Sequence, residues 1–305
     1  MIIPIYNGEQ YVAKAINSVL AQTYQNIEIL LINDGSSDGS KAVILDYINL
    51  PNVVYREQSN GGVAAARNIG LRAARGELIA FLDQDDVWMP QKIELQAQYM
   101  QTHPKIGLVH ANIEYIDEHS QPIEKRRSEW QTNASGLCFE EMFKENGIAV
   151  LTVCIRRKVC IEIGYFREDV SGVDDYDYWL RVAYSHQIGH INQVLAHYRL
   201  HTHNESQNWL RQEIRLSRVL EDAISDNPVV RRDPGANTVK SRLLPIYRKI
   251  YSEYYRRNEH LSARPYLLKC MRLDPWQKEY YLKLMVGTLP ARLRIAFRWY
   301  LKKYF

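Results

Sequence analysis

The chain has 305 residues, enough for one large domain or two modest ones. Hydrophobic residues make up 46% of it and charged residues 24%, which is typical of a globular protein that can bury a core. No run approaches about 18 consecutive apolar residues, and no secretory signal pattern is visible, so we predict neither a membrane-spanning helix nor export. The four cysteines form no CxxC pair, which favours reduced, buried thiols in a cytoplasmic chain over disulfides or a zinc site.

The net charge of +4 hides an asymmetry along the chain. From Arg231 to Phe305 there are 18 Lys and Arg against 5 Asp and Glu, whereas the preceding residues contain 21 against 30. An acidic body followed by a basic segment indicates chemistry in the first part and an anionic partner for the second.

Short apolar runs alternate with amphipathic segments over the first 115 residues. The predicted elements are strands at 2–5, 27–32, 53–56 and 78–82, and helices at 9–22, from about 40, and at 63–75. Nearly continuous apolar strands that alternate with helices are typical of parallel strands covered on both faces. This part of the sequence therefore predicts a doubly wound α/β sheet.

The rest of the chain is less regular. The expected segments are a polar loop or hairpin at 118–135, an apolar run at 148–155, a helix near 174–185, a further segment of the body at 188–198, and helices from about 205 with a break at 226–235. The fold we predict is an α/β body with a helical extension at its C-terminal end.

Polar loops follow the four predicted strands. They are Tyr6-Asn7-Gly8, the run 33–39 (NDGSSDG), the run 59–62 (SNGG) and the run 83–86 (DQDD). Because the carboxyl ends of parallel strands meet at one edge of a sheet, where ligands bind, we expect these loops to form one site.

Acidic residues in these loops suit a divalent cation and a phosphorylated ligand. Asp83 and Asp85 offer the oxygen ligands that Mg²⁺ or Mn²⁺ prefer, although two such residues also occur in ordinary solvated turns. Asp34 lies in a glycine-rich turn and can accept a hydrogen bond from a pyrimidine ring. Arg67 follows a helix start at Gly62, an arrangement that can face a diphosphate or serve close packing alone.

Two later segments carry further candidates. Asp174, Asp175 and Asp177 open a helix, where acidic residues are favourable for the helix dipole; one of the first two could instead be a general base. His201 is a potential metal ligand or an ordinary surface histidine.

Six motifs in one order carry a family resemblance. They are PIYN at 4–7, NDGSSDGS at 33–40, NGGVAAARN at 60–68, FLDQDD at 81–86, DDYDYWLR at 174–181 and YRLHTHNES at 198–206. Together they resemble the family 2 glycosyltransferases, whose fold is called GT-A. The resemblance implies an inverting enzyme that moves a sugar from a nucleoside diphosphate donor, such as a UDP-sugar, to a glycan or lipid-linked acceptor in cell-surface glycan synthesis, assisted by Mn²⁺ or Mg²⁺.

The same motifs imply roles for individual residues. Asp175 would be the general base, Asp85 and His201 would hold the metal, and the donor would be bound by Pro4, Tyr6, Asp34, Asn60, Arg67, Asp83 and Gln84. Within the donor-binding set, Tyr6 would pack on the nucleobase, Asp34 would hydrogen-bond the uracil-type ring, and Asp83 would bind the ribose. The chain departs from the family at Asp174, where a Glu is usual.

The resemblance also implies a domain division. It covers residues 1–206, a catalytic domain with a nucleotide-sugar half at 1–115 and an acceptor half at 116–206, and leaves a basic helical region at 207–305. Within that region, 289–305 has an imperfect amphipathic pattern that suits the inner face of a cell membrane with anionic lipids, or docking on its own domain. No nucleic-acid motif is visible, and a homodimer is left open.

Two alternatives remain at this stage. A catalytically silent protein that binds nucleotide sugars, or a scaffold, would keep the fold without the acidic residues. A nucleotidyltransferase would want a basic, glycine-rich loop after the first strand, where this chain has YNGEQYV at 6–12.

Overall fold

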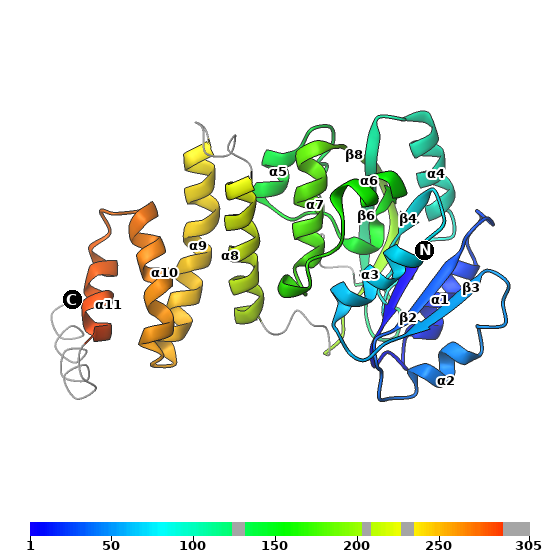
Figure 1. The fold of residues 1–305 in the computed structure, drawn as a ribbon, viewed down its shortest axis with the longest axis horizontal. Coiled ribbons are helices and arrows are strands. Elements are labelled where there is room, and N and C mark those ends of the chain that lie inside the picture. Colours follow the sequence, from blue (N-terminus) through cyan, green and yellow to red (C-terminus); the bar gives the residue numbers. More distant parts are fainter. Residues whose placement is uncertain (124–131, 203–208, 227–234, 289–305) are drawn as a thin grey trace. The chain divides into compact units, whose positions relative to one another are not determined.

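The structure, a computed structural model, describes residues 1–123, 132–202, 209–226 and 235–288. The chain divides into two compact units, Met1–Gln207 and Asn208–Phe305, and each is described by itself (Figure 1). The amphipathic segment predicted at 289–305 lies outside the described residues.

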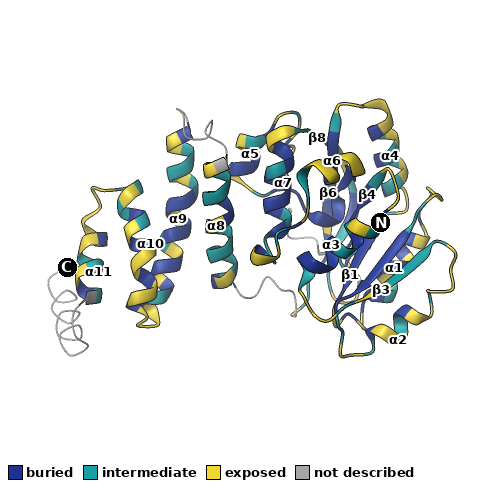
Figure 2. Ribbon diagram, in the orientation of Figure 1, coloured by how far each residue is buried: buried dark blue, intermediate teal, exposed yellow. Residues whose placement is uncertain are grey.

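The first unit begins with a parallel sheet of three strands. Its strands are β1 (Ile2–Ile5), β2 (Ile29–Asn33) and β3 (Val53–Glu57), connected by helices α1 (Val12–Leu20) and α2 (Ser40–Leu45). Strand β2 lies in the middle, with Ile3 opposite Leu31 and Leu31 opposite Tyr55. Every residue of β1 and β2 is buried, as the dark blue strands of Figure 2 show. The continuous apolar runs therefore form the interior of the sheet.

A second, mixed sheet continues from the first. Helix α3 (Val63–Ala73) leads to β4 (Leu78–Ala80), and just beyond β4 Phe81 forms a parallel bridge with Ile2 of β1. The strand order is then β4-β7-β6-β8-β5, where β6 and β8 pair in parallel and the other neighbours are antiparallel. The predicted fold class is confirmed, and β1, β2 and β3, which lead to three of the polar loops, form the parallel sheet.

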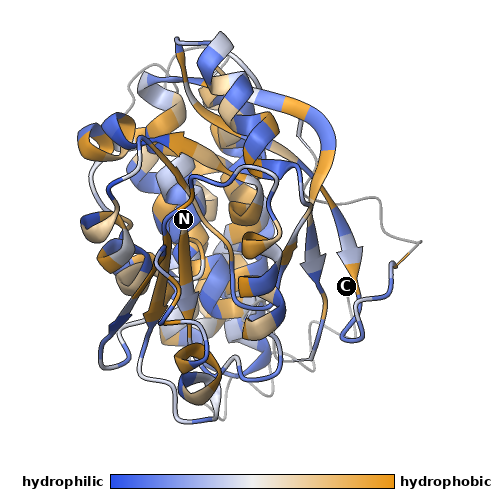
Figure 3. Ribbon diagram, turned by 90° about the vertical axis from the view of Figure 1, so that its right-hand side faces the viewer, coloured by the Kyte–Doolittle hydropathy of each residue, from blue (hydrophilic) through white to orange (hydrophobic). Residues whose placement is uncertain are grey.

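The remaining elements of this unit cover or extend the sheet. In chain order they are β5 (Val87–Trp88), α4 (Lys92–Thr102), β6 (Ile106–Ile116), α5 (Phe139–Lys144), β7 (Cys154–Arg156), α6 (Arg157–Ile163), α7 (Asp174–Ser185) and β8 (Gln187–Arg199), with short 3₁₀ turns at Val150–Thr152 and Glu168–Val170. Apolar colour dominates the central strands in Figure 3. All four cysteines of the chain are free and buried.

The second unit is helical where it is described. It contains α8 (Trp209–Asp226), α9 (Gly235–Arg256), α10 (His260–Leu273) and α11 (Lys278–Thr288), which pack in succession (Figure 1). No helix in the described ranges has both the length and the apolar character needed to cross a membrane.

The elements predicted from the apolar runs are confirmed to within a few residues. The predicted helix near 174–185 matches α7, and the segment 188–198, for which the sequence pattern predicted no element type, is strand β8. The sequence pattern did not indicate α4 and β6, because α4 mixes polar and apolar residues on its faces.

Helix α3 lies close to β1 at a single glycine. A Cβ added to Gly70 would lie 2.4 Å from Cγ2 of Ile2, which is itself fully buried. Real Cβ atoms do not approach other carbons so closely, so the absence of a side chain at this position lets the helix approach the strand.

We predict that Gly70→Ala destabilises the protein by about 1–2 kcal/mol, since overpacking outweighs the better helix propensity of alanine. Ile2→Ala removes the opposing atoms, so the double variant should be more stable than the sum of the two single effects. Urea unfolding of the three variants is the measurement. Strictly additive losses would show that the close approach carries no energetic consequence.

Candidate active site

The loop after β1 is joined to the loop after β2 by reciprocal hydrogen bonds. The Ser37 N–H donates to Asn7 Oδ1 at 2.8 Å, and the Asn7 N–H donates to Ser36 Oγ at 3.1 Å. The Gly8 N–H donates to Ser40 Oγ at 2.8 Å. Short Asn, Ser and Gly residues thus satisfy the backbone groups at the strand ends and hold the two loops together.

Gln84 holds the first of these loops by its backbone. Its Oε1 accepts from the Tyr6 N–H at 2.7 Å, and its Nε2 donates to the Tyr6 carbonyl at 2.8 Å. The side chain of Tyr6 is 46% exposed, as a platform for a ligand ring requires. A Cβ on Gly8 would lie only 2.3 Å from Gln84 Oε1. Gln84, predicted to bind a donor, therefore clamps the loop that presents Tyr6.

Asp34 connects the ends of β2 and β3. Its Oδ1 accepts from Gln58 Nε2 at 2.6 Å and from the Gly61 N–H at 2.8 Å, and its Oδ2 accepts from the Gly62 N–H at 2.8 Å. The side chain is buried, and Gly62 has φ +87°, a conformation that favours glycine. Gln58 is a partner that sequence reasoning missed.

Arg67 is buried and bound by two carboxylates. Its Nη1 donates to Asp174 Oδ2 and its Nη2 to Asp83 Oδ1, both at 2.8 Å. Its guanidinium also lies 5.7 Å from the centre of the Phe166 ring. Burial alone would lower the pKa of Arg67, but the charges of Asp83 and Asp174 raise it above its ordinary value. The Arg67 guanidinium, which the sequence predicts to face a diphosphate, is thus paired with carboxylates of the protein itself.

Asp85 and His201 lie side by side. His201 Nε2 is 2.9 Å from Asp85 Oδ2, and the two side chains are 10% and 21% exposed. The Tyr11 ring packs against the imidazole with a centroid distance of 5.0 Å. The fold thus brings together the two predicted metal ligands, which are 116 residues apart in the chain.

A buried arginine shapes the turn that carries Asp85. The Arg199 N–H donates to Asp86 Oδ1 at 2.8 Å, while its Nε donates to the Asp85 carbonyl at 2.7 Å. Its Nη1 donates to the Asp117 carbonyl at 2.8 Å. Burial, with the neighbouring Asp85 second, raises the pKa of Asp86 well above its ordinary value. Sequence reasoning missed Arg199, although a charged residue that ends an apolar strand beside His201 was a usable signal.

The two acids at the start of α7 have different surroundings. Asp174 is 1% exposed and accepts from Arg67 and from the Gly172 N–H. Asp175 is partly exposed, and its Oδ1 accepts from the Tyr176 N–H. Burial, with the charge of Asp174 second, raises the pKa of Asp175 to about 7. A carboxylate with this pKa is suited to proton transfer near neutral pH.

The other predicted donor residues lie in the same loops or strands. Pro4 is buried in β1 opposite Ile32, and Asn60 is exposed just before Gly62. Arg67 connects Asp83, a predicted donor-binding residue, to Asp174, the neighbour of the predicted base Asp175.

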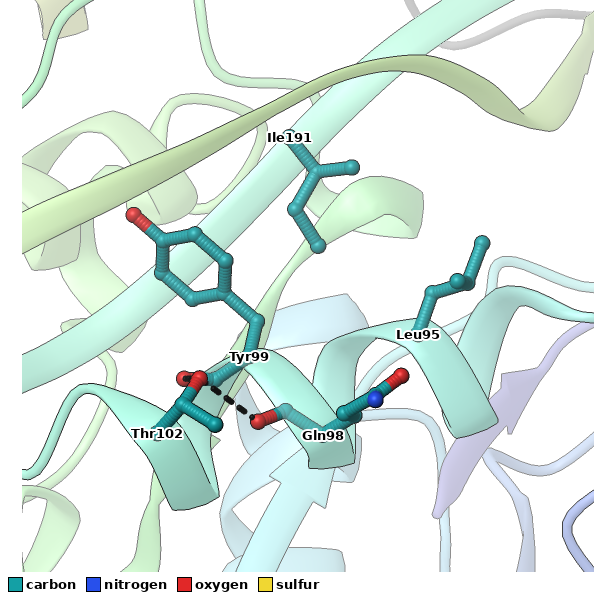
Figure 4. A pocket seen from close by; sticks show the side chains of 5 residues that line it. All are labelled: Leu95, Gln98, Tyr99, Thr102 and Ile191. Atoms are coloured by element: carbon teal, nitrogen blue, oxygen red, sulfur yellow. Dashed lines mark hydrogen bonds between the residues drawn. The ribbon is translucent and has the colours of Figure 1, made fainter.

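A separate depression lies on α4 and β8 (Figure 4). It has a volume of about 250 Å³ and is lined by Leu95, Gln98, Tyr99, Thr102 and Ile191. Thr102 Oγ1 donates to the Gln98 carbonyl at 3.0 Å, a bond within the helix. No carboxylate or basic side chain is among its lining residues.

Comparison with known proteins identifies the family. The family model for glycosyl transferase family 2 matches residues 1–164. An uncharacterized glycosyltransferase of Rickettsia prowazekii is 32% identical over 214 residues, which are 70% of this chain and 67% of that protein. Another, from Rickettsia conorii, is 33% identical, but the chain spans only 34% of its length.

One relative has a specific name. It is the UDP-Glc:alpha-D-GlcNAc-diphosphoundecaprenol beta-1,3-glucosyltransferase WfgD of Escherichia coli, which is 32% identical over 233 residues, 76% of this chain and 88% of that protein.

Solved structures agree in fold. TarS of S. aureus in complex with UDP-GlcNAc superposes with a TM-score of 0.59 at 16% identity, over 91% of this chain and 90% of that one. The mannosyltransferase PcManGT of Pyrobaculum calidifontis, in complex with GDP-Man and Mn²⁺, gives 0.61 at 16% identity, over 93% and 85%. From the family match, the relatives and the shared fold, we conclude that the chain belongs to glycosyl transferase family 2 and has the GT-A fold.

Proposed function

We propose that the chain transfers a sugar from a UDP-sugar to an acceptor hydroxyl, with inversion, in the synthesis of a cell-surface glycan. The observation that carries this proposal is the cluster of Asp83, Asp85, His201 and Asp175 at one edge of the sheet, on elements joined by Arg67. The name of WfgD, with a UDP-Glc donor and a lipid diphosphate acceptor, supports a lipid-linked acceptor. The raised pKa of Asp175, caused by burial and by the charge of Asp174, favours catalysis over silent binding.

The carboxylate of Asp85 and the imidazole of His201 suit a divalent cation that also binds the diphosphate of the substrate. The described residues contain no group of three or more His, Cys, Asp or Glu side chains that could hold a metal by themselves. Mn²⁺ and Mg²⁺ commonly take one or two protein ligands and complete their shell with substrate phosphates and water. Asp85 and His201 would hold such an ion, which would stabilise the negative charge that develops on the leaving diphosphate.

The chain's own residues account for the remaining steps. Tyr6, Asp34 and Asp83 would bind and orient the nucleoside, and the Gln84 clamp would keep Tyr6 in place. Asp175 would take the proton from the acceptor hydroxyl as that oxygen forms a bond to the anomeric carbon. The bond from that carbon to the diphosphate breaks on the opposite face, so one displacement inverts the configuration and no covalent enzyme intermediate forms.

We predict that Asp85→Ala abolishes the metal-dependent part of UDP affinity, because one of the two proposed metal ligands is lost. Calorimetric titration of UDP with and without Mn²⁺ is the measurement. Glu114→Ala is the control, since this carboxylate is 61% exposed and sits 3.7 Å from His197 rather than at the site. Unchanged affinity in Asp85→Ala would remove Asp85 from the metal site.

We predict that Asp175→Asn, which replaces the proposed general base, lowers the rate of UDP release from UDP-glucose about 100-fold or more while UDP binding stays nearly intact. Asp174→Asn should cost less, since Asp174 acts through Arg67. A base must be deprotonated, so the wild-type rate should rise with pH through about 7, the pKa of Asp175. The rate of UDP release from UDP-glucose is the readout, and a dead Asp174→Asn beside an active Asp175→Asn would exchange the two roles.

We also propose that the chain works at the inner face of the cell membrane. The basic and apolar pattern of residues 289–305 is the support, since each basic side chain near an anionic surface contributes about 1 kcal/mol. Deleting 289–305 should release the protein from vesicles that contain anionic lipid, and high salt should release the full chain. Equal, salt-insensitive sedimentation of both forms would instead favour docking of this segment on the protein.

A further inference from the structure

The N-terminal part of α7 is held to helix α3 at two neighbouring residues of α3. Arg67 binds Asp174, and Asn68 binds the segment that leads to it. Asn68 Nδ2 donates to the Phe166 carbonyl at 2.9 Å, and its Oδ1 accepts from the Phe166 N–H at 2.8 Å. The helix that begins at the donor loop therefore also carries the segment before Asp175.

Arg67, the charged residue of the neighbours Arg67 and Asn68, contacts both sides of the proposed site. Arg67 is 4% exposed, and its fork divides between Asp174, which precedes the proposed base, and Asp83, at the end of β4. A buried arginine held by two carboxylates has one orientation available to it, because moving it would leave both acids unpaired. It is thus a rigid link rather than a mobile side chain.

We propose that Arg67 is a positioning residue that fixes Asp175 against the donor site and keeps it ionisable, in place of a direct ligand of the diphosphate. This inference rests on the proposed function only where it concerns the reaction. Its support is geometric: each terminal nitrogen of the guanidinium donates a hydrogen bond to a carboxylate of the protein itself. Its Nε is buried and has no hydrogen-bond partner among the described residues.

The charges around Asp175 predict whether a substitution raises or lowers its pKa, so the direction of the pKa shift tests the inference. The groups that act on its pKa are Asp174 on its own helix, Arg67 on α3 and Asp83 after β4. The two aspartates raise the pKa of Asp175, and Arg67 lowers it. Loss of the Arg67 charge should therefore raise this pKa, while loss of the Asp174 charge should lower it.

The experiment is a ¹³C NMR titration of the aspartate side-chain carboxyls in the full chain, without donor. The Asp175 signal is identified by its loss in Asp175→Asn. Arg67→Met should raise the Asp175 pKa by about one unit, Asp174→Asn should lower it, and Arg67→Lys should lie between wild type and Arg67→Met. Arg72→Met is the matched control: Arg72 is exposed on the same helix and lies over the Tyr165 ring, so the pKa should stay in place.

A second readout separates this inference from the proposed function. The rate of UDP release from UDP-glucose with Mn²⁺ is measured as a function of pH. The acidic limb of this pH–rate profile should move to higher pH in Arg67→Met and to lower pH in Asp174→Asn. If the NMR shifts occur but no variant, wild type included, releases UDP from UDP-glucose or from any other UDP-sugar tested, the proposed function fails and the link at Arg67 stands. An unchanged Asp175 pKa in both Asp174→Asn and Arg67→Lys would overturn the inference even if Arg67→Met does not fold. A loss of donor affinity without movement of the acidic limb would instead make Arg67 a diphosphate ligand.

Discussion

The buried ion pairs of Arg67 are the interaction on which the site depends. One guanidinium, 4% exposed, joins Asp83 at the end of β4 to Asp174 at the start of α7, residues that are 91 positions apart in the chain. Arg67 and Asp174 are buried and Asp83 is partly buried, and charged groups are costly to bury unless each finds its partner. The loop after β4, helix α3 and the start of α7 must therefore come together for Arg67 and Asp174 to be buried without a large penalty. The two halves of the site are therefore assembled by a single requirement for charge neutralisation.

The polar loops around Arg67 are likewise held by side chains whose hydrogen-bonding groups are satisfied within the protein. Asp34 accepts three hydrogen bonds from the β3–α3 connection, and Gln84 satisfies both backbone groups of Tyr6. Arg199 does the same for the turn at Asp85 and Asp86. Because these side chains orient the backbone, the partly exposed residues Tyr6 and Asp175 would already be positioned when the proposed substrates bind.

Much of the fold was predictable because buried parallel strands have a simple signature. The runs at 2–5 and 27–32 are apolar on both faces, and their polar ends implied a common edge. The proximity of Asp85 and His201 was predictable only from the family resemblance, since no periodicity relates positions so far apart. What the sequence could not show is which acidic residues are already paired. Asp174 and Asp175 are identical in type and adjacent, and only the fold shows that Arg67 binds the first. Strand β6 was missed because its partners, β7 and β8, come much later in the chain.

The central claim is that this edge of the sheet performs one displacement at an anomeric carbon. A thermal-shift screen of nucleotide sugars with Mn²⁺ would select the donor, and ¹H NMR of its breakdown by the full chain would then follow the anomeric proton of the first product. With an α-linked donor, the account predicts that UDP and the β-anomer of the sugar appear first and that the α-anomer grows in only later by mutarotation. An initial α-product would contradict single displacement, and stabilisation by a nucleotide sugar without any release of UDP would contradict catalysis itself.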